Sequence, residues 1–313
     1  MKKKLAFTLL VGFIIVNIVA YNHAYRFSHF EITSNEKTSK PEALNLLNKL
    51  KVLVLGITNP KPKNTKFPNI TYEVVKLTTQ DKYELDTWYI KHDNAIGTVA
   101  LFHGYTGTKS DLINEAYAFH KLGYNTLLVD FFGSGSSTGN KTTIGYYEAE
   151  DVKKVYDFLV SKKESNIILY GVSMGAVAIT KATANYTLHP SAIILECPYG
   201  SLLNTVQNRF DLMGIPSFGF AELLVFWGGI QNGYWGFNLN TIDFAKDIHI
   251  PTFVMHGKND QRASLAEVEK VFDNLAGFKK LKLFENTEHE SFYRKFPKEW
   301  SNEVTLFLNE IRD

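Results

Sequence analysis

The chain has 313 residues, of which 45% are hydrophobic, and a formal net charge of +2. This length and apolar content are sufficient for one α/β domain with a well-filled core. A charge so close to zero, without a basic helix or a ladder of aromatic residues, argues against nucleic acid as a partner.

The N-terminus combines positive charge with an apolar run. Lys2, Lys3 and Lys4 precede Leu5–Tyr21, which contains no charged residue. This pattern is typical of a signal peptide or a membrane anchor, and its length lies between the two. Small residues suited to signal cleavage are poorly placed, which favours an uncleaved anchor over residues 1–24. A cleaved signal and a buried helix are the alternatives. With an uncleaved anchor or a cleaved signal, the rest of the chain is expected outside the cytoplasm, either membrane-anchored or secreted.

Residues 25–68 are predicted to be a tether. A short helix is expected over residues 41–50, packed on the body of the protein. Residues 60–66 alternate proline with lysine and are interpreted as a basic linker. We expect this linker in solvent, with contact to anionic lipid as the alternative.

A single α/β domain is predicted over residues 69–313. Two strands over residues 72–77 and 83–90 lack a long crossover, so we expect an antiparallel pair at the edge of a sheet. Buried strands over residues 98–102 and 125–130 then alternate with helical stretches, which predicts that the rest of the sheet is mostly parallel and flanked by helices.

A glycine-rich segment, Asp130–Gly139, follows one of these strands. A phosphate loop is a rival interpretation, because residues 135–142 come close to a Walker motif. The lysine stands one residue late, however, and a dinucleotide fingerprint would belong on the first strand–helix turn. Nucleotide binding is therefore disfavoured.

The stretch Gly171–Gly175 reads G-x-S-x-G. It follows an apolar strand over residues 166–170 and opens onto a helix over residues 176–182, which is the context of a nucleophile elbow. Such a turn would lift the hydroxyl group of Ser173 clear of the sheet. A serine in an ordinary glycine-flanked turn is the alternative, because three fixed positions often recur by chance.

A nucleophilic serine needs a base, and the base needs a carboxylate. In this architecture their order along the chain is serine, acid, histidine. His289 lies in a polar loop after an alternating strand, although a solvated loop histidine is possible on sequence alone. Asp260 lies in the loop after the strand over residues 251–256, where α/β sheets carry catalytic groups. Glu196, one strand earlier, is the second candidate acid.

Two backbone N–H groups are predicted to form an oxyanion hole, those of Tyr105 and Met174. Tyr105 follows a buried strand within His103–Gly107, and Met174 begins the helix after Ser173. His103 precedes the serine, at the wrong end of the expected order, so we interpret it as a structural residue.

These motifs together resemble the α/β-hydrolase superfamily, near its serine-aminopeptidase-like and monoacylglycerol-lipase-like branch. The resemblance covers about residues 70–310 and implies the fold, an inserted cap and a Ser-His-Asp triad, but not the substrate. Phe132 stands where the branch usually has an arginine, which puts the role of that arginine in fixing nearby loops in doubt. Ala263 and Ser264 stand where the branch usually continues toward a proline. The resemblance rests on His103–Gly107, Asp130–Gly139, Gly171–Gly175, Pro251–Asp260 and His289.

Residues 201–247 are predicted to form the helical cap. Between Phe210 and Phe237, eight of 28 residues are aromatic, which is twice the share of 14% in the whole chain. This excess favours a lipophilic group in the substrate, and packing of the cap on the body is the alternative. The eight are Phe210, Phe218, Phe220, Phe226, Trp227, Tyr234, Trp235 and Phe237.

The predicted function is therefore a serine hydrolase of carboxylic esters, without a metal or other cofactor. One alternative is a peptidase that trims short peptides, but Glu222 is the only acid in the aromatic part of the cap that could hold an amino terminus. Another is an inactive, tethered binding protein, against which the complete triad argues. The single cysteine, Cys197, excludes an internal disulfide and is interpreted as a buried side chain.

Overall fold

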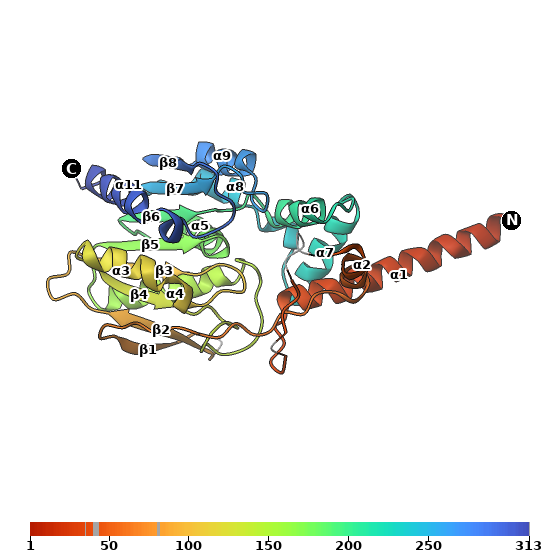
Figure 1. The fold of residues 1–313 in the computed structure, drawn as a ribbon, viewed down its shortest axis with the longest axis horizontal. Coiled ribbons are helices and arrows are strands. Elements are labelled where there is room, and N and C mark those ends of the chain that lie inside the picture. The colour runs from red at the N-terminus through yellow and green to blue at the C-terminus, as the bar shows by residue number, and fades with distance from the viewer. Residues whose placement is uncertain (35, 40–43, 80–81, 313) are drawn as a thin grey trace.

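A central eight-stranded sheet organises the computed structural model, which describes residues 1–34, 36–39, 44–79 and 82–312 (Figure 1). The strands are Glu73–Thr78 (β1), Glu84–Ile90 (β2), Thr98–Phe102 (β3), Asn125–Val129 (β4), Ile167–Val172 (β5), Ala192–Glu196 (β6), Thr252–Gly257 (β7) and Lys279–Phe284 (β8). Their spatial order is β1-β2-β4-β3-β5-β6-β7-β8. β2 pairs antiparallel with both β1 and β4, and every later pairing is parallel. The predicted mostly parallel sheet is confirmed.

Helices cover both faces of this sheet (Figure 1). The α-helices of the described chain, including those that lie away from the sheet, are Lys2–Ser28 (α1), Leu46–Leu55 (α2), Ile113–Lys121 (α3), Glu148–Ser161 (α4), Met174–Asn185 (α5), Leu202–Met213 (α6), Phe220–Asn232 (α7), Thr241–Phe244 (α8), Leu265–Asn274 (α9), Phe292–Lys295 (α10) and Pro297–Glu310 (α11). One core lies between the sheet and α4, α5 and α9, and a second core lies between the sheet and α3, α10 and α11. Every residue of β3, β4 and β6 is buried, because both faces of these strands are covered.

The predicted helical cap is confirmed between β6 and β7, where α6 and α7 leave the plane of the sheet (Figure 1). Ser201 caps the start of α6 by accepting a hydrogen bond from the N–H of Asn204 (3.1 Å). The helix ends at Gly214, whose φ of 69° lies in the left-handed region that glycine adopts without strain. The cap therefore has defined ends set by its own sequence.

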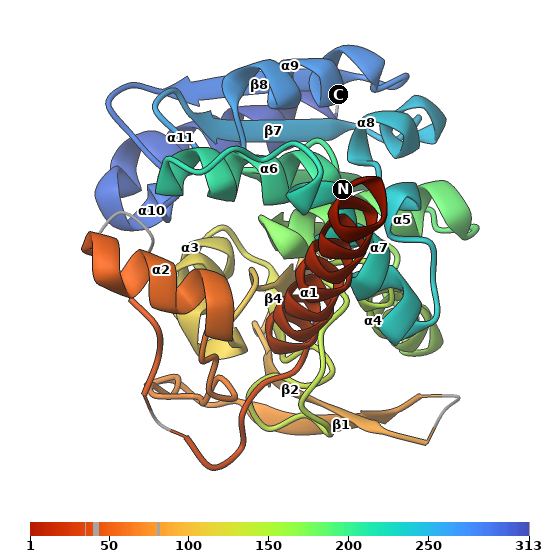
Figure 2. The ribbon, with the colours of Figure 1, turned by 90° about the vertical axis from the view of Figure 1, so that its right-hand side faces the viewer.

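The N-terminal apolar segment forms a single helix, α1, which continues past residue 24 to Ser28. Its first part projects away from the body, and its last turns lie beside α7 (Figures 1 and 2). The Trp227 indole donates a hydrogen bond to the side-chain oxygen of Asn17 (3.1 Å), and its ring meets Tyr21 edge-on at 5.4 Å. By length and composition, α1 is the one helix of the described chain that is suited to cross a membrane.

Part of the predicted tether docks on the body of the protein. The N–H of Phe30 donates to the carbonyl of Asn140 (2.7 Å), whose side chain donates back to the Phe30 carbonyl (2.9 Å). The Lys61 ammonium donates to the carbonyl of Ser137 (2.8 Å) instead of lying in solvent as expected. Residues 41–43 of the predicted short helix lie outside the described residues.

Candidate active site

Ser173 occupies a strained turn between β5 and α5. Its φ of 52° and ψ of −110° are unfavourable for a residue with a side chain. A Cβ on Gly171 would lie 2.5 Å from the carbonyl carbon of Gly175, and a Cβ on Gly175 would lie 2.3 Å from the carbonyl oxygen of Phe102. Only glycine fits at both positions, and the turn presents the Ser173 side chain at the carboxyl end of the sheet.

The structure brings the three predicted side chains together. Nε2 of His289 lies 3.0 Å from Oγ of Ser173, and Nδ1 of His289 lies 2.7 Å from Oδ2 of Asp260. The three residues come from separate loops after β5, β7 and β8, whose carboxyl ends share one edge of the sheet. Such a relay can move a proton from the hydroxyl group to the imidazole while the carboxylate orients the ring.

Asp260 is held as a carboxylate by its surroundings. Its side chain is buried, and burial alone would raise its pKa. The hydrogen bond and charge of His289 and the N–H of Ala263 outweigh burial, so that the pKa of Asp260 lies below its usual value. Oδ1 accepts the backbone N–H groups of Arg262 (2.8 Å) and Ala263 (3.1 Å), which leaves Oδ2 for the histidine. This pattern fixes the orientation of the carboxylate.

Glu196, the second candidate acid, lies on β6 with its side chain in the core between the sheet and α11. Its carboxyl group accepts a hydrogen bond from the Trp300 indole. Burial raises its pKa to about 8. The backbone carbonyl of Glu196, in contrast, accepts the N–H of Ser173 (2.7 Å). Glu196 therefore supports the nucleophile turn with its backbone and does not contact His289 with its carboxyl group.

The two predicted oxyanion donors belong to segments that adjoin Ser173. Met174 is the first residue of α5, so its N–H has no intrahelical acceptor. A Cβ on the neighbouring Gly104 would lie 3.5 Å from Cβ of Ser173, which shows how closely the loop carrying Tyr105 approaches the serine. Within the described residues, neither N–H has a hydrogen-bond acceptor.

His103 shapes the same loop. Its Nε2 accepts the N–H of Phe131 (3.2 Å), and its Nδ1 lies 2.8 Å from the carbonyl oxygen of Gly104. Burial lowers the pKa of His103, which favours the neutral ring that these two contacts require.

The glycine-rich segment folds around Asp130. Oδ2 of Asp130 accepts the N–H of Ser136 (2.9 Å), and its carboxylate also binds the buried ammonium group of Lys109 (2.6 Å). The backbone of this loop therefore donates to the Asp130 carboxylate, which belongs to the same segment. Phe132, which replaces the usual arginine, packs on Tyr83 with ring centroids 4.4 Å apart, so apolar packing fixes this part of the loop.

One group of potential metal ligands occurs in the described chain, and it overlaps the same site. The thiol of Cys197 and the ligand atoms of Asp260 and His289 lie within 4.8 Å of one another. Because the carboxylate and imidazole are already hydrogen-bonded to each other, a metal ion would have to displace that bond. Burial raises the pKa of the Cys197 thiol, which disfavours the thiolate that a metal prefers.

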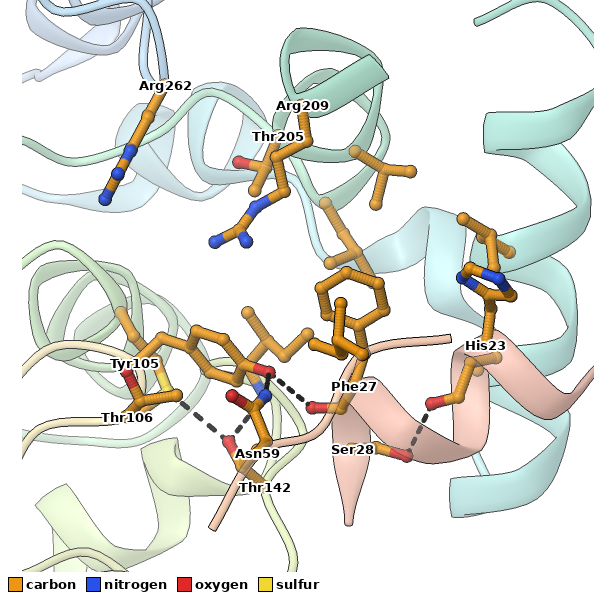
Figure 3. Close-up of a pocket in the computed structure, with 18 of the residues that line it drawn as sticks. His23, Phe27, Ser28, Asn59, Tyr105, Thr106, Thr142, Thr205, Arg209 and Arg262 are labelled. Carbon is orange, nitrogen blue, oxygen red and sulfur yellow. Dashed lines mark hydrogen bonds between the residues drawn. The ribbon is translucent and has the colours of Figure 1, made fainter. Parts of the chain in front are cut away.

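A cavity of about 630 Å³ lies over Ser173 and His289. Its walls come from the cap, from the loop of Tyr105 and from α1, which the sequence did not indicate as part of the site (Figure 3). Of the eight aromatic cap residues, Phe210, Phe220 and Tyr234 line the cavity. Phe226 and Trp227 are not part of its lining; Trp227 packs on α1, and Phe226 packs on Trp227 and Trp235.

Known proteins share this architecture. Residues 93–215 match the serine aminopeptidase family S33. The Pyrococcus furiosus esterase Pf2001 superposes with a TM-score of 0.65 at 23% identity, over 80% of this chain and 98% of that one.

The chain has the α/β-hydrolase fold, and its residues 93–215 are similar to that hydrolase family. Two relatives are similar in sequence. Bacillus subtilis YqkD is 26% identical over 74% of this chain and 77% of its own length. The Saccharomyces cerevisiae membrane protein YNL320W is 26% identical over 46% of this chain and 51% of its own length. The matches support a hydrolase activity for this chain.

Proposed function

We propose that the protein is a serine hydrolase of carboxylic esters with a lipophilic acyl group. The observation that carries this proposal is the contact of Ser173 with His289, and of His289 with Asp260, at the floor of an apolar cavity. The aliphatic walls of the cavity favour a substrate with an apolar part, because each buried methylene contributes about 0.8 kcal/mol.

The reaction follows from the positions of these groups. Oγ of Ser173 attacks the ester carbonyl carbon while Nε2 of His289 takes the hydroxyl proton. The N–H groups of Tyr105 and Met174 stabilise the negative oxygen of the tetrahedral intermediate. His289 then donates its proton to the leaving alcohol, which breaks the ester bond and leaves an acyl-serine. Water, deprotonated by His289, releases the carboxylic acid and restores the serine.

The charges around the cavity favour an ester over a short peptide with a free amino terminus. Among the described lining residues, Glu290 is the only carboxylate, and it is paired with Lys295 at 2.8 Å. Three cationic side chains, Lys37, Arg209 and Arg262, line the same cavity. The described lining residues thus carry more positive than negative formal charge, which disfavours a substrate ammonium group.

The membrane helix completes the proposal. We place α1 in the bilayer with Lys2–Lys4 on the cytoplasmic side, because positive residues that flank a span stay there. The α/β domain then lies outside the cytoplasm, on the other side of the membrane.

The proposal is tested with a fluorophosphonate probe, which labels activated serines. Full-length protein in detergent is expected to be labelled, and Ser173→Ala is expected to abolish labelling while keeping the thermal midpoint. Ser291→Ala is the matched control, because Ser291 also lines the cavity and its loss is expected to preserve labelling. Ester and aminoacyl amide substrates are then compared. Labelling that persists in Ser173→Ala, or faster turnover of amides, contradicts the proposal.

A further inference from the structure

One face of α1 forms a wall of the cavity. The lining residues repeat every four positions along the helix, which places them on a single stripe. They extend from Ile15, in the segment suited to cross a membrane, to Phe27 and Ser28, beside the loop of Tyr105. At 1.5 Å per residue, the stripe is about 20 Å long. The lining residues of α1 are Ile15, Val16, Val19, Ala20, His23, Ala24, Phe27 and Ser28.

The facing wall comes from the cap. Leu224, Val225 and Gly228 of α7 line the cavity opposite the stripe on α1. Small residues bring the two helices together: a Cβ on Gly228 would lie 3.8 Å from Cβ of Ala24. The cavity is therefore an apolar channel between α1 and the cap, and it leads from Ser173 along the membrane helix.

The far end of this channel lies at membrane depth. Leu5–Tyr21 spans about 26 Å as a helix, close to the 30 Å of a hydrocarbon core. Ile15 is 55% exposed in the isolated chain, and outward-facing residues of the same segment such as Phe13 are 64% exposed, as expected for contact with lipid. The Tyr21–Trp227 pair marks the level where aromatic residues favour the membrane surface.

The cap carries further exposed apolar side chains. Phe218 is 89% exposed, and Ile230 and Trp235 are about half exposed. Their helix and its flanking loops adjoin α1, where it leaves the body (Figures 1 and 2). Apolar groups in such positions are favourable when the cap rests on the membrane surface.

The other end of the channel is polar and cationic. The side chains of Arg209 and Arg262 point into the cavity near Tyr105 and Thr106 (Figure 3). The Arg209 guanidinium lies over the rings of Tyr105 (5.5 Å) and Phe27 (5.7 Å), which hold it at the junction between α1 and the oxyanion loop. Guanidinium groups bind phosphate and carboxylate groups strongly.

From these two ends we infer that the substrate is an anionic amphiphile that enters from the bilayer. Its acyl chain lies in the channel along α1, its ester carbonyl lies at Ser173, and its anionic group lies against Arg209 and Arg262. A lipid that follows this route keeps its chain in apolar surroundings throughout. The inference rests on the proposed ester hydrolysis and adds the class of substrate and its route of entry.

A pair of α1 variants tests the channel. Val19→Trp fills the lining stripe, and Ile18→Trp places the same ring one position away, where the parent residue is 62% exposed and outside the cavity. The ratio of kcat/KM for dodecanoate to acetate esters is measured in full-length protein. Val19→Trp is expected to lower this ratio at least tenfold, because several buried methylenes lose their site. Ile18→Trp is expected to leave it unchanged. Equal ratios in both variants would contradict the inference that the acyl chain lies along α1.

A reconstituted system tests the polar end and the route. Full-length protein in phosphatidylcholine vesicles receives monododecanoyl glycerol 3-phosphate or monododecanoyl glycerol, either in the same vesicles or in separate ones. In the same vesicles, we expect the carboxylic ester of monododecanoyl glycerol 3-phosphate to be hydrolysed at least tenfold faster than that of monododecanoyl glycerol. We expect Arg209→Gln to remove this preference. The control Lys163→Gln removes an equal charge at the opposite edge of the sheet and is expected to retain it.

The possible outcomes separate the two proposals. Equal rates for the two esters, or faster hydrolysis from separate vesicles, overturn the inference while leaving an esterase. A protein that hydrolyses no ester of any length and resists the fluorophosphonate probe overturns the proposed function itself.

Discussion

Replacing Asp260 by Asn tests the proposed relay at its most informative atom. Asparagine matches aspartate in shape, and its oxygen can still accept the N–H groups of Arg262 and Ala263 that now bind Oδ1. Its NH₂ group would then face Nδ1 of His289, where the carboxylate oxygen now lies at 2.7 Å. Two donors cannot share one bond, so the imidazole must place its proton on Nε2, towards Ser173. The base is then unable to accept the serine proton.

The expected loss is large. The same exchange in a well-studied triad lowers kcat by about 10⁴, which corresponds to about 5.4 kcal/mol of transition-state stabilisation. Hydrolysis of a chromogenic ester that is long enough to fill the cavity measures the effect, and the thermal midpoint verifies folding. Glu196→Gln is the matched control and is expected to stay within about threefold of the parent, because its carboxyl group contacts Trp300 and not His289. If Asp260→Asn retains a tenth of the activity, or if Glu196→Gln loses as much, the assignment of the acid is refuted.

Three further predictions concern the N-terminal helix, the buried carboxyl group of Glu196 and the cap. Carbonate-washed membranes are expected to retain the full-length chain, and a soluble form that begins near Tyr21 would show cleavage instead. The thermal midpoint of the parent is expected to fall as pH rises from about 5 to 8. Burial raises the pKa of Glu196 to about 8, so the folded state binds this proton more tightly than the unfolded state. Glu196→Gln should make the midpoint depend less on pH, and the contribution of Asp151, whose pKa is also raised to about 8, should remain. Trp227→Ala is expected to lower the thermal midpoint by about 5 °C without changing the preference for acyl chain length, because Trp227 packs on α1 outside the cavity. Phe220→Ala alters the lining of the cavity and is expected to reduce that preference. The opposite pattern would contradict the assignment of the cavity walls.

Much of the sheet and of the relay could be predicted because local patterns determine them. Continuous apolar runs predict strands covered on both faces, and β3, β4 and β6 are fully buried. The glycines around Ser173 predict a turn too tight for a Cβ, which agrees with the observed approach of 2.3 Å at Gly175. The order of serine, acid and histidine selects Asp260 and His289 without knowledge of any distance.

The walls of the cavity could not be predicted in the same way. Composition shows that the cap is rich in aromatic residues, but it does not show that Phe226 and Trp227 face away from the substrate site. An apolar run that enters lipid also has the same composition as one that lines a channel. His23 and Ser28 are polar residues of α1 that are buried and line the cavity, but nothing in the sequence alone assigns them to the inner face of the helix. The docking of Phe30 depends in part on a backbone hydrogen bond to Asn140, which leaves no signal in the sequence.

The position of α1 also bears on whether the N-terminal segment is removed. Cleavage near Tyr21 would delete Val16, Val19 and Ala20 from the cavity wall and remove the Asn17 partner of Trp227. It would leave the apolar side of α7 open to water, at about 25 cal/mol for each square ångström newly exposed. A signal peptide has no reason to carry a lining stripe or an amide that matches an indole 210 residues away. These contacts favour a helix that stays attached. In the proposed arrangement, membrane anchoring and the shape of the cavity therefore depend on the same residues.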